Sequence, residues 1–278
     1  MLHSDSMSFM NDIRTITLLS VLTLIFLAVG FLFAGIAGML IGLVFALGIN
    51  FVSYWYSDSF VLRLYRAKPA LEKDYPELYI SLEKLSKKAA IPVPKLYIVN
   101  MDAPNAFATG RSPDKGAVAV TRGLLSHLNT EEIEAVIAHE LGHIKNRDTL
   151  VSAMAATISG AMTWLAYLFF FGSSENRNIF SYLLLFILAP LAAMLIRMAI
   201  SRSREFSADE FGGKISNPLH LASALEAINA AVKQKPMKGN NATSHMFIIN
   251  PFSSGLAGLF STHPPVNVRT ARLRRMAI

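Results

Sequence analysis

The sequence predicts a mainly α-helical membrane protein with a small β-sheet, in which four transmembrane helices carry a cytoplasmic domain built on extensions of those helices. Three observations predict this class: 53% of the 278 residues are hydrophobic, only 16% are charged, and the apolar residues gather in four long runs. Soluble domains usually carry about 25% charged residues. The composition therefore disfavours both an ordinary soluble enzyme and a disordered chain.

The four apolar runs are long enough to cross a membrane. They cover roughly residues 16–35, 36–56, 149–172 and 180–200. Each holds about 20 residues, which as a helix spans a hydrocarbon core of about 30 Å. A buried core helix is the alternative for any single run, but four nearly uncharged runs favour spans. The sequence predicts an N-terminal cytoplasmic segment (1–15) and two transmembrane hairpins (16–56 and 149–200). The first part of the cytoplasmic domain (57–148) follows the first hairpin, and its second part (201–278) follows the second hairpin.

Basic residues flank the predicted spans on one side. Arg63 and Arg66 follow the second span and Arg202 follows the fourth, whereas the loop at 172–179 holds one arginine beside a glutamate. The positive-inside rule therefore places the polar segments in the cytoplasm of a multi-pass protein of the bacterial inner membrane. The net charge of +7 is interpreted as topology and contact with the lipid bilayer, with no nucleic-acid partner. The absence of cysteine excludes disulfides and thiolate metal ligands.

Local patterns predict the elements of the polar segments. Helices are expected over residues 75–88, 130–147 and 218–231. Short β-like runs, bounded by Pro, Gly, Asp and Asn, are expected over 95–100, 105–109 and 116–121. The fourth span is expected to continue as a helix to about Phe211, where Gly212 and Gly213 end it. Residues 233–245 are polar and predict a loop.

The helix at 130–147 carries the run His139-Glu140-Leu141-Gly142-His143. Side chains at i and i+4 share a helix face, so both imidazoles can reach one metal ion. Neutral imidazole nitrogens suit zinc, and the intervening Glu140 lies beside an open coordination position, where it can act as a general base. The alternative is an amphipathic helix with two exposed histidines.

A catalytic zinc ion needs a third protein ligand. Residues 144–149 contain no histidine, which leaves carboxylates as candidates. His143 and Glu205 lie roughly 50 and 44 Å of helix from the midpoint of the second hairpin, so they reach nearly the same height. This match favours Glu205 as a ligand, with a solvated acidic face as the equal alternative. Asp209 lies one turn beyond Glu205 and by itself is typical of such a solvated face.

These residues resemble the signatures of a known family. The run Ser201-Arg202-Ser203-Arg204-Glu205-Phe206-Ser207-Ala208-Asp209 resembles the R-E-x-x-A-D signature of the HtpX-type integral-membrane zinc metalloproteases, whose wider relatives include the CAAX prenyl endopeptidases. The resemblance covers nearly the whole chain. It includes the paired N-terminal spans and the segments 104–110, 139–148 and 261–269.

The resemblance implies a zincin-like domain and a role for each motif residue. It implies one Zn²⁺ per chain on His139, His143 and Glu205, Glu140 as catalytic base, and Asp209 orienting a histidine. It places His263 and Arg269 near the developing oxyanion. It also implies that an edge strand binds extended substrate, through Asn105, Ala106, Phe107, Ala108 and Thr109.

The activity implied is that of a metalloendopeptidase for misfolded or damaged membrane proteins and unfolded polypeptides, in membrane quality control and the stress response. Association with other quality-control proteases is expected as well. Two alternatives remain at this point. One is a prenyl-protein endopeptidase of narrower specificity, and the other is a membrane scaffold that binds zinc only for structure.

Overall fold

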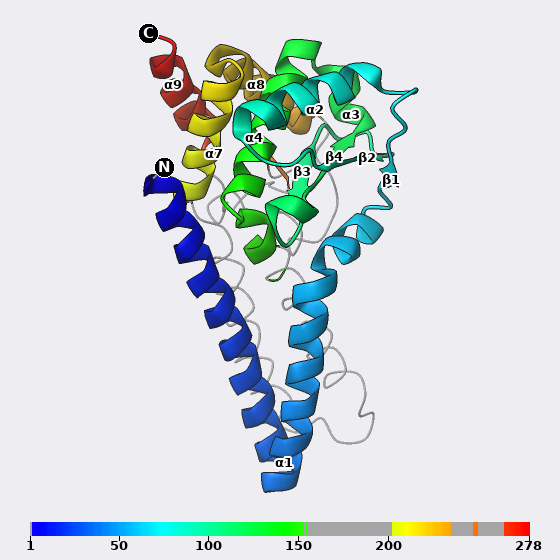
Figure 1. Ribbon diagram of the computed structural model, residues 1–278, viewed down its shortest axis with the longest axis vertical. Helices are drawn as coiled ribbons and strands as arrows, with labels where there is room; N and C mark the ends of the chain where they lie inside the picture. The colour runs from blue at the N-terminus through cyan, green and yellow to red at the C-terminus, as the bar shows by residue number, and fades with distance from the viewer. Residues whose placement is uncertain (1, 153, 155–201, 235–246, 250–263) are drawn as a thin grey trace. The chain divides into compact units, whose positions relative to one another are not determined.

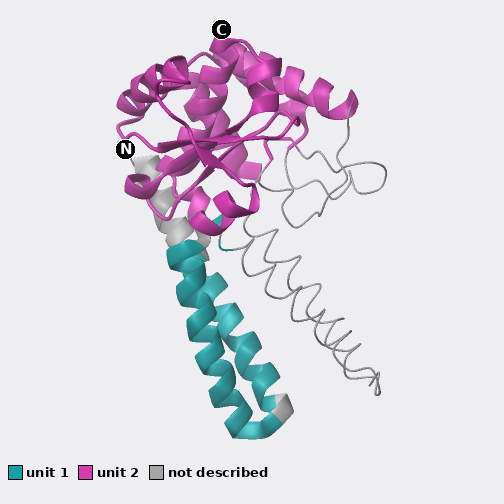
Figure 2. Ribbon diagram, turned by 90° about the vertical axis from the view of Figure 1, so that its right-hand side faces the viewer, with its two compact units in different colours: residues 1–57, 151–199 teal, residues 58–150, 200–278 magenta. Residues whose placement is uncertain are grey.

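The computed structural model describes residues 2–152, 154, 202–234, 247–249 and 264–278. It is mainly helical with one small mixed sheet. The chain divides into two compact units, coloured separately in Figure 2. Unit 1 comprises residues 1–57 and 151–199, and unit 2 comprises residues 58–150 and 200–278.

Unit 1 contains most of helix α1 (Leu2–Leu64). The helix breaks at Ala34 and Gly35, where Gly35 adopts φ 57°. This positive φ is readily available only to glycine, and it folds α1 back on itself as a hairpin (Figure 1). The break lies where the sequence predicts the turn between the first two apolar runs.

Glycines bring the two arms of the α1 hairpin close together. A Cβ atom on Gly38 would lie 2.0 Å from the carbonyl oxygen of Gly30, and one on Gly42 would lie 2.3 Å from that of Phe26. Large apolar side chains are exposed on the hairpin, among them Leu24, Phe31, Leu40, Val44 and Phe45. Small residues at a helix contact with apolar side chains outside are typical of helices that lie in lipid.

Within the described residues, one helix is long and apolar enough to cross a membrane. It covers Ala34–Tyr56 with a mean hydropathy of 2.2, and Thr15–Phe31 is apolar but shorter. Of the predicted third span, only residues 149–152 and 154 are described, and they are helical. The rest of that span, the fourth span and the loop between them lie outside the described residues. Four transmembrane helices and the five predicted domains therefore stay predictions.

Unit 2 contains a four-stranded sheet in the order β1-β2-β4-β3. Its strands are β1 (Lys68–Pro69), β2 (Lys95–Val99), β3 (Ala106–Thr109) and β4 (Ala117–Thr121). β2 pairs with β4 in parallel, and the β1–β2 and β3–β4 pairs are antiparallel. β3 therefore lies at one edge. The three strands predicted by sequence are confirmed to within a residue, whereas the two-residue β1 was too short to predict.

Helices cover the sheet and form the core with it (Figure 1). They are α2 (Pro76–Ala89), α3 (Arg122–His127), α4 (Thr130–Lys145), α7 (Arg202–Ile215), α8 (Pro218–Gln234) and α9 (Val266–Met276). A three-residue 3₁₀ turn, Pro113–Lys115, connects β3 to β4. α4 is central, since it packs against α2, α7, α8 and β3. Its inner residues, including Ile137, Leu141 and Ile144, are fully buried.

The start of α4 is fixed by a capping box. The side chain of Asn129 accepts a hydrogen bond from the Glu132 amide at 2.9 Å, and the Glu132 carboxylate accepts one from the Asn129 amide at 3.1 Å. The reciprocal bonds satisfy two amides that a helix start leaves unpaired. The predicted helix at 130–147 is confirmed apart from its last two residues, which form the turn that follows.

The prediction that Gly212 and Gly213 end a helix is wrong, because α7 continues to Ile215. Glycine is needed here for contact: a Cβ atom on Gly212 would lie 2.8 Å from the backbone nitrogen of His139. α8 also continues beyond the predicted end at Ala231 to Gln234, so two residues assigned to the polar loop are helical. The rest of that loop, 235–245, lies outside the described residues.

Candidate metal centre

α4 presents two histidines on one face. The Nε2 atoms of His139 and His143 lie 3.2 Å apart, and the two rings are perpendicular. His139 is buried and His143 is half-buried. The expected i, i+4 pair is therefore present, with both Nε2 atoms directed at one point.

α7 brings a carboxylate to the same point. Oε1 of Glu205 lies 3.6 Å from Nε2 of His143, and Glu205 is buried. The approach is possible because small residues line the α4–α7 contact: a Cβ atom on Gly142 would already lie 3.2 Å from Cα of Ala208. The structure thus brings together the two histidines of the H-E-x-x-H run and Glu205, the carboxylate favoured by its matching distance from the midpoint of the second hairpin.

The donor set fits a divalent cation. One ligand atom from each of His139, His143 and Glu205 lies within 4.8 Å of the others. Two ligands of a tetrahedral zinc ion with bonds of about 2.0–2.1 Å lie about 3.3 Å apart. The observed 3.2 and 3.6 Å separations are close to that value. With neutral imidazoles and ionised carboxylates, four carboxylates and two guanidinium groups around the site give a net charge of −2. These groups belong to Glu140, Glu205, Asp148, Asp209, Arg204 and Arg269.

Asp209 connects the first histidine to a buried arginine. Its Oδ1 lies 3.0 Å from Nδ1 of His139. Arg269 of α9 donates to both oxygens of Asp209, from Nη2 at 2.7 Å and from Nε at 2.8 Å. Burial alone would raise the pKa of Asp209, but the charge and hydrogen bonds of Arg269, with a contribution from His139, lower it to about 2. The ionised carboxylate can therefore hold a proton on Nδ1 and leave Nε2 free to bind metal.

Arg269 lies among the ligands themselves. Its Nη1 is 3.3 Å from Oε2 of Glu205 and donates to the Ile248 carbonyl at 3.2 Å, while Nη2 is 3.5 Å from Nε2 of His139. Burial alone would lower the pKa of Arg269, but Asp209, Glu205 and Glu140 raise it, so the side chain stays charged. Its predicted role near the oxyanion stays a prediction. His263, the other residue predicted there, lies outside the described residues.

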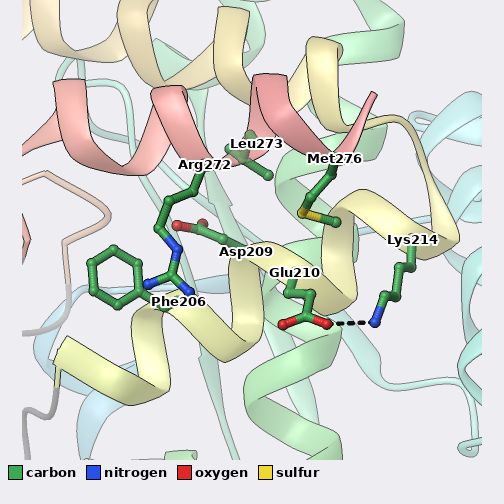
Figure 3. Close-up of a pocket in the computed structure, with 7 residues that line it drawn as sticks. All are labelled: Phe206, Asp209, Glu210, Lys214, Arg272, Leu273 and Met276. Carbon is green, nitrogen blue, oxygen red and sulfur yellow. Dashed lines mark hydrogen bonds and ion pairs between the residues drawn. The ribbon is translucent and has the colours of Figure 1, made fainter. Parts of the chain in front are cut away.

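A cleft of about 330 Å³ lies between α7 and α9, and Asp209 forms part of its lining (Figure 3). The guanidinium of Arg272 stacks over the Phe206 ring, 4.1 Å from its centroid, and Lys214 pairs with Glu210. Leu273 and Met276 of α9 complete the lining. The stacking of Arg272 of α9 on Phe206 of α7 therefore supports, at the surface, the contact that carries Asp209 and Arg269, whereas the Lys214–Glu210 pair lies within α7.

Asp148 faces the second histidine, a contact that no local sequence pattern indicates. Its Oδ2 lies 3.0 Å from Nδ1 of His143, and its Oδ1 lies 3.7 Å from Nε of Arg204. A two-residue turn, in which Arg147 adopts φ 58°, separates α4 from Asp148. Burial alone would lower the pKa of His143, but the bond to Asp148 and the charges of Glu205, Asp148 and Glu140 raise it to about 9. The carboxylates that favour a proton there also favour a metal cation.

Glu140, the predicted base, is buried between the two histidines on α4. Its negative charge contributes to the raised pKa of both His143 and Arg269. No hydrogen bond to its carboxylate is found among the described residues. A carboxylate in this position can accept a proton from a metal-bound water molecule.

The predicted substrate strand is β3, which pairs with β4 on one side and with no other described strand. Ala106, Phe107 and Thr109 are buried, and Ala108 is half-buried. Asn105 holds the strand in place. Its backbone N–H donates to Thr121 Oγ1 at 2.9 Å, and its side-chain Oδ1 accepts from the backbone N–H of Ile248 at 3.0 Å. β3 also contacts α4, the helix that carries the two histidines. Substrate binding by these five residues stays a prediction.

An H-E-x-x-H helix with a third carboxylate ligand on a neighbouring helix defines a metalloprotease centre. Comparison with known proteins agrees. Residues 72–277 match the family model "Peptidase family M48", and the chain belongs to that family. It is therefore a metalloprotease.

Similar proteins cover almost the whole chain. A "Protease HtpX homolog" from Salinibacter ruber is 51% identical over 273 residues, 96% of this chain and 99% of its own length. One from Pyrococcus furiosus is 50% identical over 277 residues, 96% of each chain. These relatives and the apolar helix support a membrane metalloprotease.

The crystal structure of S. mikatae Ste24p has a similar fold, with a TM-score of 0.54 at 18% identity. The likeness covers 96% of this chain and 66% of that one.

Proposed function

We propose that this protein is a zinc endopeptidase with one Zn²⁺ per chain, held by His139, His143 and Glu205. The observation that carries the proposal is the convergence of ligand atoms from His139, His143 and Glu205 within 4.8 Å of one another. The two separations that involve Nε2 of His143, 3.2 and 3.6 Å, are close to the value for tetrahedral zinc. Two further carboxylates face the outer nitrogens of the histidines, as metal-binding histidines require.

Zinc, when bound, lowers the pKa of a coordinated water molecule and polarises the scissile carbonyl. The residues of the chain perform the rest. Glu140 accepts the water proton and passes it to the leaving amine. Arg269, and His263 as implied by the family resemblance, stabilise the oxyanion. Asp209 and Asp148 face the outer nitrogens of the two imidazoles and keep the Nε2 atoms directed at the metal.

The substrate is proposed to bind as an extended strand along β3. Binding to an edge strand uses main-chain hydrogen bonds, so it reads the backbone more than the side chains. Broad specificity follows, which suits unfolded segments of misfolded or damaged membrane proteins. A role in membrane quality control and stress, together with partner proteases there, extends the same proposal.

The proposed membrane arrangement has four spans and a cytoplasmic protease domain. It rests on the apolar helix Ala34–Tyr56, on the further apolar runs at 149–172 and 180–200, and on the distribution of basic residues. The cysteine-free chain allows a direct test with single cysteines. In intact bacterial cells, an impermeant maleimide should label Asn176→Cys but not Lys68→Cys. The reverse pattern would overturn the orientation.

The metal site is tested by measuring zinc content and affinity of the purified full chain in detergent. We expect one zinc per chain, lost in His143→Ala and in Glu205→Ala. The exposed Glu210 of α7 supplies a control, and Glu210→Ala should bind zinc as the wild type does. Unchanged affinity in Glu205→Ala would remove that residue from the ligand set.

Substrate class is tested by offering the zinc-loaded protein an unfolded polypeptide, a membrane-protein substrate and a prenylated C-terminal peptide. Cleavage of the first two supports the proposal. Cleavage of the prenylated peptide alone would identify the narrower endopeptidase instead.

A further inference from the structure

Asp148 and Arg204 form a buried pair on the side of His143 that faces away from the metal position. Both side chains are almost completely buried. One carboxylate oxygen of Asp148 faces Nδ1 of His143 at 3.0 Å, and the other faces Nε of Arg204 at 3.7 Å. The two residues come from different elements, since Asp148 follows α4 and Arg204 lies in the first turn of α7.

We propose that Asp148 and Arg204 are a positioning pair that fixes the tautomer and ring orientation of His143 for metal binding. The inference rests on the proposed function, because it takes His143 to be a ligand through Nε2. It assigns Arg204 a task of its own, next to the ligand Glu205 in sequence and separate from the Asp209–Arg269 pair that serves His139.

The chemistry of the groups explains the task. A neutral imidazole has one N–H donor and one acceptor nitrogen, and an ionised carboxylate can only accept. With Asp148 facing Nδ1, the proton is held there and the Nε2 lone pair is left for the metal. A buried carboxylate needs a compensating charge, which the guanidinium of Arg204 supplies. Arg204 therefore acts on the metal site through Asp148.

The role of the Asp148–Arg204 pair at the metal site can be distinguished from a role in folding the turn. Asp148 is placed by the left-handed turn at Arg147, and its neighbour Thr149 donates to the Gly110 carbonyl at 2.7 Å. That bond holds the turn against the end of β3. Removing the charge of Asp148 leaves this hydrogen bond of the Thr149 hydroxyl in place, so metal affinity can be tested apart from the position of the turn.

The experiment measures Zn²⁺ affinity of the purified full chain in detergent, by competition with a chelating indicator. Asp148→Asn should bind zinc about 10–100-fold more weakly, because the amide carries no charge and offers a donor as well as an acceptor. Arg204→Gln should weaken binding less, and Arg204→Lys should restore most of the affinity. The exposed residues Asp114 and Arg202 supply matched controls: Asp114→Asn and Arg202→Gln should bind as the wild type does.

Two further readouts exclude a merely structural role. The visible absorption of the Co²⁺-substituted protein should change in Asp148→Asn, because the His143 ligand has changed. In the double variant Asp148→Asn/Arg204→Gln, zinc affinity should equal that of Asp148→Asn alone. If Arg204→Gln costs the same factor in both backgrounds, Arg204 does not act through Asp148.

His143→Ala, measured in parallel, distinguishes the two levels of the proposal. If His143→Ala binds zinc normally, the proposed metal site itself is wrong. If His143→Ala loses zinc while Asp148→Asn keeps wild-type affinity and cobalt spectrum, only the positioning pair is wrong. Should Asp148→Asn not fold, Arg204→Gln against Arg204→Lys decides, and equal wild-type affinity in both would overturn the inference.

Discussion

Arg269 donates two hydrogen bonds to the carboxylate of Asp209, at 2.7 and 2.8 Å, and both side chains are buried. This bidentate pair joins α9 to α7 directly behind the first histidine. Arginine matches a carboxylate with two parallel N–H groups, which lysine cannot do. The pair therefore contributes to the fold and to the metal site at once.

We expect Arg269→Gln to lower the free energy of unfolding by about 3–5 kcal/mol, because it leaves Asp209 charged and buried without its partner. Thermal unfolding in detergent measures the loss. Arg274 of the same helix supplies the control, since it pairs with Glu226 at 2.9 Å on the surface. Arg274→Gln should cost less than about 1 kcal/mol. Equal losses in the two variants would contradict the assignment.

Gly212→Ala should separate α7 from α4. The added Cβ atom would meet backbone atoms of His139 at 2.8 and 2.9 Å, and backbone cannot move aside as a side chain can. We expect a loss of about 1–3 kcal/mol in stability. Weaker zinc binding should accompany it, because Glu205 moves with α7. Both are measurable on one preparation.

The adjacent Gly213 is the matched control. A Cβ atom there would meet only side-chain atoms at 3.2–3.4 Å, from Pro218, Leu273 and Met276. Gly213→Ala should therefore leave zinc affinity unchanged. Equal zinc affinity in the two alanine variants would show that the close approach at Gly212 does not set the position of Glu205.

Local signals made part of this structure predictable. The start of α4 follows from Asn129 and the acidic first turn, and the strands follow from short apolar runs between breakers. The metal ligands on α4 follow from the H-E-x-x-H run, whose two histidines share one helix face. Glu205 required an argument about chain geometry, because its partner His143 lies 62 residues earlier in the sequence.

Tertiary contacts explain what the sequence could not show. Asp148 faces His143 after a turn in which Arg147 takes a left-handed conformation, which arginine rarely adopts, so no local pattern predicts the contact. Gly212 was predicted to end a helix because glycine is common at helix ends. Its close contact with α4 is a tertiary feature that the local sequence does not indicate. α9 was not predicted, because four arginines among its eleven residues obscure the apolar periodicity of a helix. The helix packs through the buried side chains of Arg269 and Leu273.

Protonation of Glu134 in acid should slightly lower the free energy of unfolding. Its carboxylate accepts from Ser81 at 2.9 Å and from Lys84 at 3.0 Å, joining α4 to α2. Burial alone would raise the pKa of Glu134, but the hydrogen bonds and the charges of Lys84 and Lys88 lower it below its ordinary value of 4.5. The ionised form thus stabilises the fold above about pH 4.5, and this contribution is lost as the pH falls through the lowered pKa.

Glu134→Gln should therefore cost less than about 1 kcal/mol at neutral pH, and the difference from wild type should shrink in acid. Unfolding midpoints across the pH range measure it. Glu131 on the same helix is exposed, so Glu131→Gln should show no such trend. A difference that stays constant down to acid pH would contradict the assignment to the Glu134 carboxylate.

Glu140→Gln should separate catalysis from metal binding. The amide keeps the size of the side chain and cannot accept the water proton, so cleavage should fall by about 10²–10⁴-fold. Zinc content should stay at the wild-type level, because His139, His143 and Glu205 are intact. Glu131→Gln, on the exposed side of α4, should cleave normally. If Glu140→Gln cleaves at the wild-type rate, another group is the base; if it loses zinc, Glu140 belongs to the ligand set.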